Sequence, residues 1–299
     1  MSGPSRDDPK PSTGPALSAL RGPVVSGLLS LLLLALCLVL WWAVAWWFEL
    51  PPLVLPLPGD VARVLVRNLI DGTFWPHLLV TLTEIALGFA IGSGLGIGLG
   101  SLVALSPFLQ RVLHPYVIAS QAMPKLALAP IFVIWFGFGI LPKAAIAALI
   151  CFFPLFENTL VGLRSVQDDA VELFRMFGAS RWQQFVHLRM PNALPYVFAG
   201  LRVSIVLSVV GAVVGEFVGA NQGLGALIMA SQGMMDTPLM FAVFVLLTLV
   251  GVALYELLAL CERLVMRRRS RIVPLVRLPG GSRIRRKSSY GSSPESGEG

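Results

Sequence analysis

The sequence predicts an all-α protein that crosses a membrane six times. Of its 299 residues, 56% are hydrophobic and only 13% are charged, which is about half of the charge in a typical soluble domain. So few charges could not cover the surface of a soluble protein of this size, and a soluble enzyme is therefore excluded. The apolar residues are also gathered into long segments without charge, as membrane-spanning helices require.

The first predicted span covers residues 22–48, which contain no charged side chain. This segment is too long for the apolar core of a signal peptide, which has about 7–15 residues. It ends in four tryptophans, Trp41, Trp42, Trp46 and Trp47, and tryptophans commonly anchor a helix at the membrane interface. We therefore expect an uncleaved first helix.

Five further spans are expected in the remaining apolar regions. They cover residues 85–110, two helices within 112–163 that the turn-like segment 137–142 divides, 196–219 and 238–262. Together with the first span they form a six-helix body over residues 22–263. The flanking residues 1–21 and 264–299 are rich in Pro, Ser, Gly and charge, a composition typical of disordered tails.

The basic residues predict the orientation of the chain. If the N-terminus is cytoplasmic, 18 of the 23 Lys and Arg lie in cytoplasmic segments and 3 lie in the opposite loops. Cytoplasmic loops of membrane proteins carry an excess of Lys and Arg, so both termini are expected in the cytoplasm. The net charge of +7 then reflects topology and contact with membrane lipid, and no nucleic-acid partner is expected.

The sequence offers no catalytic or metal-binding constellation. The three cysteines are far apart, the three histidines are scattered, and no Ser/His/Asp set shares a short window. The glycine-rich segment 92–100 lacks the lysine of a phosphate-binding loop. We therefore expect no enzyme, no metal site and no cofactor in the chain itself.

Glycines recur at every fourth position in the predicted second helix, at Gly88, Gly92, Gly96 and Gly100. Helix backbones approach closely where side chains are absent, and dispersion contacts are the main attraction between helices in lipid. The stripe therefore predicts close helix packing, within one subunit or between two.

A polar segment, residues 164–193, interrupts the apolar body. Apolar residues recur in it at helical spacing, which predicts two short amphipathic helices broken near Gly178. The spacing of Glu172, Gly178 and Pro191 resembles the "EAA" loop of ABC importer permeases, although Leu173 and Phe174 replace its two alanines.

Other stretches resemble the nitrate/sulfonate/taurine-type subfamily of these permeases. They include residues 124–139, the Val-Gly-Glu-Phe of 214–217 and the Gly-Leu-Gly of 223–225. The resemblance implies a type I ABC importer transmembrane domain over about residues 70–262, in a bacterial inner membrane.

The resemblance also implies a division of labour between subunits. Two permeases would form the pathway, two cytoplasmic ATPase subunits would bind and hydrolyse ATP, and an extracytoplasmic binding protein would deliver the solute. The loop of residues 164–193 would dock on the ATPase. The residues that the resemblance assigns to this coupling are Glu172, Arg175, Gly178, Ala179, Leu188 and Pro191.

Four residues are candidates for the translocation path or its gate: Lys125, Trp135, Arg202 and Glu216. Charges within a membrane are costly and often functional. The alternative is that they reach toward the membrane surface or form internal ion pairs, and Glu216 is the least suited to an anionic solute.

The resemblance leaves the substrate and the number of copies open. A small oxyanion such as a sulfonate, taurine or nitrate is favoured, and a pyrimidine precursor or riboflavin is the alternative. A homodimer is favoured over a pair of related permeases, because one chain supplies one coupling loop and a two-fold interface is the commonest assembly. A functional alternative from another class is an ion-coupled secondary transporter.

Overall fold

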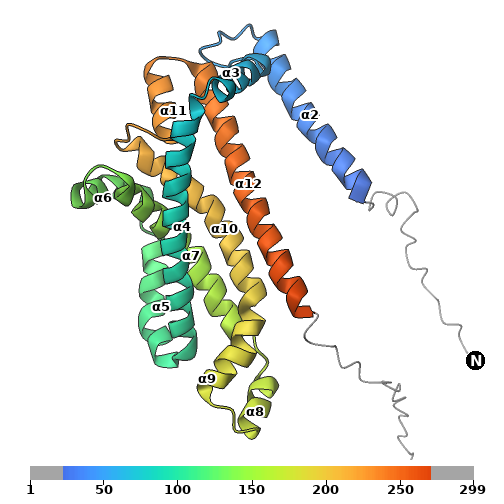
Figure 1. Cartoon of the computed structure of the whole chain (residues 1–299), viewed down its shortest axis with the longest axis vertical. Coiled ribbons are helices and arrows are strands. Elements are labelled where there is room, and N and C mark those ends of the chain that lie inside the picture. The colour runs from blue at the N-terminus through green and yellow to red at the C-terminus, as the bar shows by residue number, and fades with distance from the viewer. Residues whose placement is uncertain (1–22, 271–299) are drawn as a thin grey trace, which may run out of the picture. The chain divides into compact units, whose positions relative to one another are not determined.

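The computed structural model describes residues 23–270, which form helices and connecting turns without a strand (Figure 1). The chain divides into two units, Met1–Ala259 and Leu260–Gly299, and the boundary falls within the last helix. The expected tails, residues 1–21 and most of 264–299, lie outside the described residues.

Within the described residues, five helices are long and apolar enough to cross a membrane. They are α2 (Pro23–Trp47), α4 (Phe74–Leu105), α7 (Ile140–Arg164), α10 (Met190–Phe217) and α12 (Thr237–Ser270). A bent pair of helices supplies the sixth crossing if it is counted as one span. The predicted all-α, multi-pass fold is confirmed.

The third predicted span is the bent pair. It consists of α5 (Pro107–Gln121), the short 3-10 helix η1 (Lys125–Leu128) and α6 (Ala129–Phe136), with a bend of 86°. Pro124 lies in the break, and a proline disfavours helical backbone at the residue before it. A continuous helix over this region is therefore interrupted.

The boundaries of two other helices differ from those expected. Helix α4 begins eleven residues earlier than the predicted span, at Phe74, and it contains Glu84; charge-free stretches locate helices but not their ends. It stops at Leu105, and the Ser106 side chain accepts a hydrogen bond from the Leu109 N–H at the start of α5. Helix α12 ends at Ser270, eight residues beyond the predicted end.

Helix α7 forms the centre of the bundle, and α4 packs along one side of it through the glycine stripe. A Cβ atom at Gly96 would lie 2.9 Å from the carbonyl oxygen of Phe152, and one at Gly100 would lie 2.9 Å from that of Phe156. Gly88 and Gly92 face Ala147 and Cys151 of α7 in the same way. These separations leave no room for side chains between the two backbones.

Helix α10 packs on α7 by the same means. A Cβ atom at Gly211 would lie 2.6 Å from the Ala147 Cα, and one at Gly215 would lie 2.9 Å from the Lys143 Cα. Ala147 therefore touches glycines of both α4 and α10. Two helices, α4 and α10, are thus held in backbone contact with α7.

Shorter helices connect these spans. They are α3 (Pro58–Ile70), α8 (Asp168–Met176), α9 (Arg181–Gln184), the π-helical turn η2 (Phe185–Arg189) and α11 (Leu224–Gly233). Helices α8 and α9 lie at the end of the bundle where α4 meets α5, and α11 lies near the opposite end (Figure 1).

Replacing a glycine of the stripe should destabilise the protein. Gly92→Val and Gly96→Val should each lower the free energy of unfolding by about 1–3 kcal/mol or more, because the added methyl groups overpack the contact with α7. Thermal unfolding of the purified chain in detergent measures the loss.

Gly94→Val and Gly98→Val are matched controls, because a Cβ atom at either position meets nothing within 4 Å. They carry the same helix-propensity cost on the same helix. If the control variants lose as much unfolding free energy as Gly92→Val and Gly96→Val, the close packing of α4 on α7 is contradicted.

Candidate functional site

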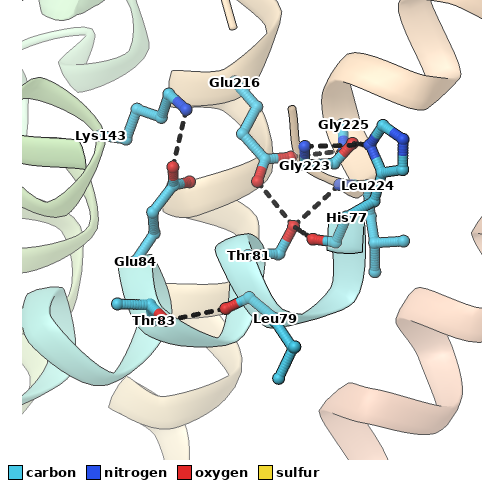
Figure 2. A network of polar contacts seen from close by, with 10 residues as sticks. All are labelled: His77, Leu79, Thr81, Thr83, Glu84, Lys143, Glu216, Gly223, Leu224 and Gly225. Atoms are coloured by element: carbon cyan, nitrogen blue, oxygen red, sulfur yellow. Dashed lines mark hydrogen bonds and ion pairs between the residues drawn. The ribbon is translucent and has the colours of Figure 1, made fainter. Parts of the chain in front are cut away.

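A buried polar network joins four helices near the end of the bundle that carries α11 (Figure 2). Its charged members are Glu84 on α4, Lys143 on α7 and Glu216 on α10, and all three are buried. Burying charge in an apolar bundle is costly unless each group is paired. Three ionisable groups buried within a membrane bundle are therefore a candidate functional site.

Lys143 and Glu84 form an ion pair across α7 and α4. The Lys143 Nζ donates to the Glu84 Oε1 at 2.7 Å. The second carboxylate oxygen of Glu84 is buried without a hydrogen-bond partner among the described residues, and Glu84 interacts electrostatically with Glu216. The Lys143 ammonium is paired with Glu84 alone, so full ionisation of the three groups places two buried negative charges near one positive charge.

Glu216 connects α10 to the start of α11. Its carboxylate accepts a hydrogen bond from the Thr81 hydroxyl at 2.6 Å and another from the Gly225 N–H. The Thr81 hydroxyl oxygen in turn accepts from the Leu224 N–H at 2.8 Å. The first amide groups of a helix have no partner within it and attract negative charge, and here Glu216 and Thr81 supply those partners.

Two glycines make this contact possible. The Gly223 N–H donates to the His77 Nδ1 at 3.1 Å, and Gly223 has φ of +126°, a conformation that side chains other than glycine rarely adopt. A Cβ atom at Gly223 or Gly225 would collide with the Glu216 carboxylate. The network therefore fixes the position of α11 relative to α4 and α10.

A cavity of about 480 Å³ borders the ion pair. Lys143 lines it together with Asn221, Gln222 and the turn of Phe138–Ile140. The polar residues of its lining, Asn221 and Gln222, come from the α10–α11 connection, and Lys143 comes from α7. It is a place where a small polar solute could meet the network.

The structure brings one of the four predicted path residues, Glu216, into the network. Lys125 instead places its Nζ 3.7 Å from the centre of the Phe153 ring, a cation–π contact. Trp135 is 70% exposed on α6, and Arg202 is half-buried on α10. These three residues are not members of the network in Figure 2.

The predicted site residues do not include the other side chains of the network, which are His77, Thr81, Glu84 and Lys143. A signal was present, because Glu84 and Lys143 have opposite charge within two apolar regions. Ionisable side chains within membrane-spanning helices commonly form ion pairs with one another.

The predicted coupling segment lies at the opposite end of the bundle. Helix α8 ends at Met176, and Gly178 follows with φ of +72°, which is the left-handed turn that a residue without a Cβ tolerates best. Ser180 then caps α9: its hydroxyl accepts from the Gln183 N–H at 3.2 Å, and its own N–H donates to the Gln183 Oε1 at 2.8 Å.

The second expected short helix is not separate from the fifth span. Helix α9 passes through the π-helical turn η2 into α10, so that one helix extends from Arg181 to Phe217. Pro191 lies at the start of α10 and Pro195 lies within it. Pro191 has no N–H to donate to the preceding turn, and the wider π turn before it carries the chain onward without a break.

The tip of this segment exposes large apolar side chains. Met176 is 83% exposed, Phe177 is 81% exposed and Trp182 is 68% exposed. Of the residues expected in coupling, Glu172 and Arg175 are exposed, whereas Ala179 and Leu188 are half-buried. Such a patch rimmed by polar groups is typical of a protein interface.

The fold and these two sites define a membrane-spanning transport subunit. Residues 92–270 match the family described as binding-protein-dependent transport system inner membrane component, and the chain belongs to that family. The expected assignment to the ABC importer permeases is confirmed.

Several curated relatives match over most of their length. The riboflavin transport system permease protein RibX of Chloroflexus aurantiacus is 41% identical over 78% of this chain and 87% of its own. The formylaminopyrimidine transport permease protein ThiX of Halalkalibacterium halodurans is 40% identical over 67% and 80%. The taurine transport system permease protein TauC of Escherichia coli is 33% identical over 72% and 80%.

Solved structures resemble the chain in fold. The inward-facing MetNI methionine ABC transporter has a TM-score of 0.54 with 21% identity, covering 68% of this chain and 96% of the matched one. This similarity supports the type of membrane domain, whereas the identity is too low to indicate a solute.

Removing one member of the ion pair should lower the free energy of unfolding more than removing both members. Lys143→Met leaves Glu84 buried without a cation and should reduce the free energy of unfolding by about 3–5 kcal/mol. The double variant Glu84→Gln/Lys143→Met should recover a large part of that loss, and thermal unfolding of all four proteins in detergent tests it. Simple addition of the two single losses would show that the pair is not coupled in the folded protein.

Proposed function

We propose that this permease carries a small solute inward through a pathway whose opening is driven by a separate ATPase subunit. The observation that carries the proposal is the single helix from Arg181 to Phe217. One end of this helix lies beside the exposed tip of the coupling segment, and Glu216 near the other end belongs to the buried network. At about 1.5 Å per residue its 37 residues span roughly 55 Å.

This continuity suggests how docking could reach the pathway. Residues Met176, Phe177 and Trp182 would enter a groove of the ATPase, with Glu172 and Arg175 beside them. Movement of the tip would pass through the π turn into α10, because a continuous helix transmits rotation and translation. At the far end, displacement of Glu216 from Thr81 and Gly225 would release α11 and open the cavity beside Lys143.

The assembly would contain two copies of this chain. Closure of an ATPase dimer around ATP requires two docking segments, and the described residues contain one segment of this kind. A homodimer supplies the second with a self-complementary interface. Two ATPase subunits and an extracytoplasmic binding protein complete the proposed complex, with both termini of the permease in the cytoplasm.

The solute is proposed to be a flavin or a pyrimidine precursor, with a sulfonate-type oxyanion as the second candidate. The order rests on two observations. RibX and ThiX are 41% and 40% identical to this chain, against 33% for TauC. In addition, the network beside the candidate cavity contains two carboxyl groups and one ammonium group, which does not favour a simple anion.

Substitution at the turn of the coupling segment should uncouple ATP hydrolysis from transport. Gly178→Val should reduce solute-stimulated ATPase activity in the reconstituted complex several-fold, because a β-branched residue disfavours φ near +72°. Glu172→Lys should weaken capture of the ATPase by reversing a charge at the contact.

Gly72→Val is the matched control. Gly72 also has positive φ, +82°, and open space around its Cβ position, but it lies between α3 and α4. Unchanged stimulation in the Gly178 variant, or equal loss in both glycine variants, would contradict a specific coupling role.

The binding protein that serves this permease should identify the solute. We expect riboflavin or an aminopyrimidine to raise its melting temperature, since a bound ligand stabilises the folded state. Taurine and alkane sulfonates serve as the comparison set in the same thermal-shift experiment. Stabilisation by the sulfonates alone would reverse the order of the two candidates and leave the permease role intact.

A further inference from the structure

A second cavity, of about 460 Å³, lies where the coupling segment faces the junction of α4 and α5. Leu105 and Pro107 form part of the wall on the side of this junction. Polar and basic side chains form the other walls: Arg164, Arg175, Arg181, Arg189, Gln110 and Gln184. Arg175 also lies in the proposed ATPase contact, whereas the exposed apolar side chains of the tip, Met176, Phe177 and Trp182, do not line this cavity.

Four positive charges therefore surround one space. Among the described residues, none of the four arginines forms an ion pair with a carboxylate, and Arg164 and Arg189 act on each other as like charges. Arg164 is also held in place, since its Nη2 donates to the Val103 carbonyl at 3.3 Å. Gathering unpaired cations in this way is unfavourable unless an anion joins them.

The π turn contributes to this arrangement. On a regular α-helix, Arg189 would lie about 80° around the axis from Arg181, because successive residues are separated by about 100°. The turn η2 contains one residue more than an α turn, which rotates Arg189 back to within about 20° of Arg181. Arg181, Gln184 and Arg189 consequently face the same cavity, as observed. Single π turns inside helices are often found at functional sites.

The chemistry of the walls selects the ligand. A guanidinium group binds the oxygens of a phosphate through two parallel hydrogen bonds, and four such groups suit an anion with more than one negative charge. The side chains of Gln110 and Gln184 can supply further polar contacts, and Gln184 is held by a hydrogen bond from its Nε2 to the Ala179 carbonyl at 2.9 Å. The volume lies within the range of ordinary ligand pockets.

We propose that this cavity binds a phosphate-bearing anion, and that the head group of an anionic phospholipid is its occupant. Leu105, which lines the cavity, is an exposed apolar residue of α4, and Phe108 and Val112 are exposed apolar residues of the adjoining α5. They offer a surface along which acyl chains can lie while the head group reaches the arginines. Basic pockets between helices at the cytoplasmic face are a known mode of anionic-lipid binding.

A lipid in this position would bridge the coupling segment and the rest of the bundle. Arg175 and Arg181 flank the turn at Gly178, whereas Arg164 belongs to the end of α7 and Gln110 to α5. Neutralising their charges would favour the close approach of these elements. The lipid composition of the membrane would thereby affect how firmly the coupling segment is held.

Thermal unfolding of the full-length chain in a neutral detergent tests the proposal. Cardiolipin should raise the melting temperature in a saturable way, whereas phosphatidylcholine should not. The double variant Arg164→Gln/Arg189→Gln should weaken the apparent affinity for cardiolipin about tenfold or more, because two charge-assisted contacts are lost. Arg111→Gln is the matched control, since Arg111 is exposed on α5 and does not line the cavity.

A further experiment distinguishes a lipid from a soluble phosphate. Pyrophosphate added without lipid should raise the melting temperature less than cardiolipin does. If pyrophosphate raises it equally, and the double variant abolishes this effect, the cavity binds a soluble phosphate and the lipid assignment is overturned. Equal cardiolipin affinity in the wild type and the double variant would overturn the site. If the double variant does not fold, the single variant Arg189→Gln replaces it. Weaker cardiolipin affinity in this variant supports the site, and unchanged affinity overturns it.

A partner protein is the remaining competitor for these arginines. If the double variant retains cardiolipin binding but loses capture of the ATPase subunit, the arginines belong to the subunit interface, which contradicts the proposal. Loss of cardiolipin binding with ATPase capture retained supports it.

Discussion

The close approach of α4 and α10 to α7 is the constraint on which the rest of the structure depends. In lipid, helices gain little from the hydrophobic effect when they associate, so contact between backbones and the dispersion energy that comes with it become decisive. Glycines of α4 and α10 face α7 from two sides, and Gly88 and Gly211 both lie against Ala147. Only at such short separations can side chains as short as Thr81 and Glu84 bridge from one helix to the next.

The polar network and the continuous helix both follow from this packing. Lys143 lies opposite Gly215 of α10 and reaches Glu84 of α4, so the ion pair spans the same three-helix contact. Glu216 then ties α10 to the start of α11. Because α10 is continuous with α9, Glu216 near one end and Trp182 near the other belong to one helix. In the proposed mechanism, this connection would carry movement of the docked ATPase to Glu216.

The sequence was sufficient to predict the class of fold, the apolar spans and the family. Long charge-free stretches and glycines at every fourth position are local patterns, and the coupling segment has a spacing that can be read directly. The charges of Glu84 and Lys143 within apolar regions indicate that each needs a partner, but the sequence does not show that they pair with each other, because they are 59 residues apart and their pairing depends on how α7 packs. The π turn was not predictable either: a short helix separate from the fifth span was expected, and only the structure shows that the helix continues through Pro191 and Pro195.

Transport by the reconstituted complex is the most direct test of this account. The permease should be placed in sealed vesicles with its ATPase and binding protein, and solute uptake should be measured with and without ATP at the ATPase face while ionophores dissipate every ion gradient. The account predicts uptake that requires ATP and persists when the gradients are removed. Uptake by the permease alone, without ATP and driven by an ion gradient, would contradict it and identify a secondary transporter.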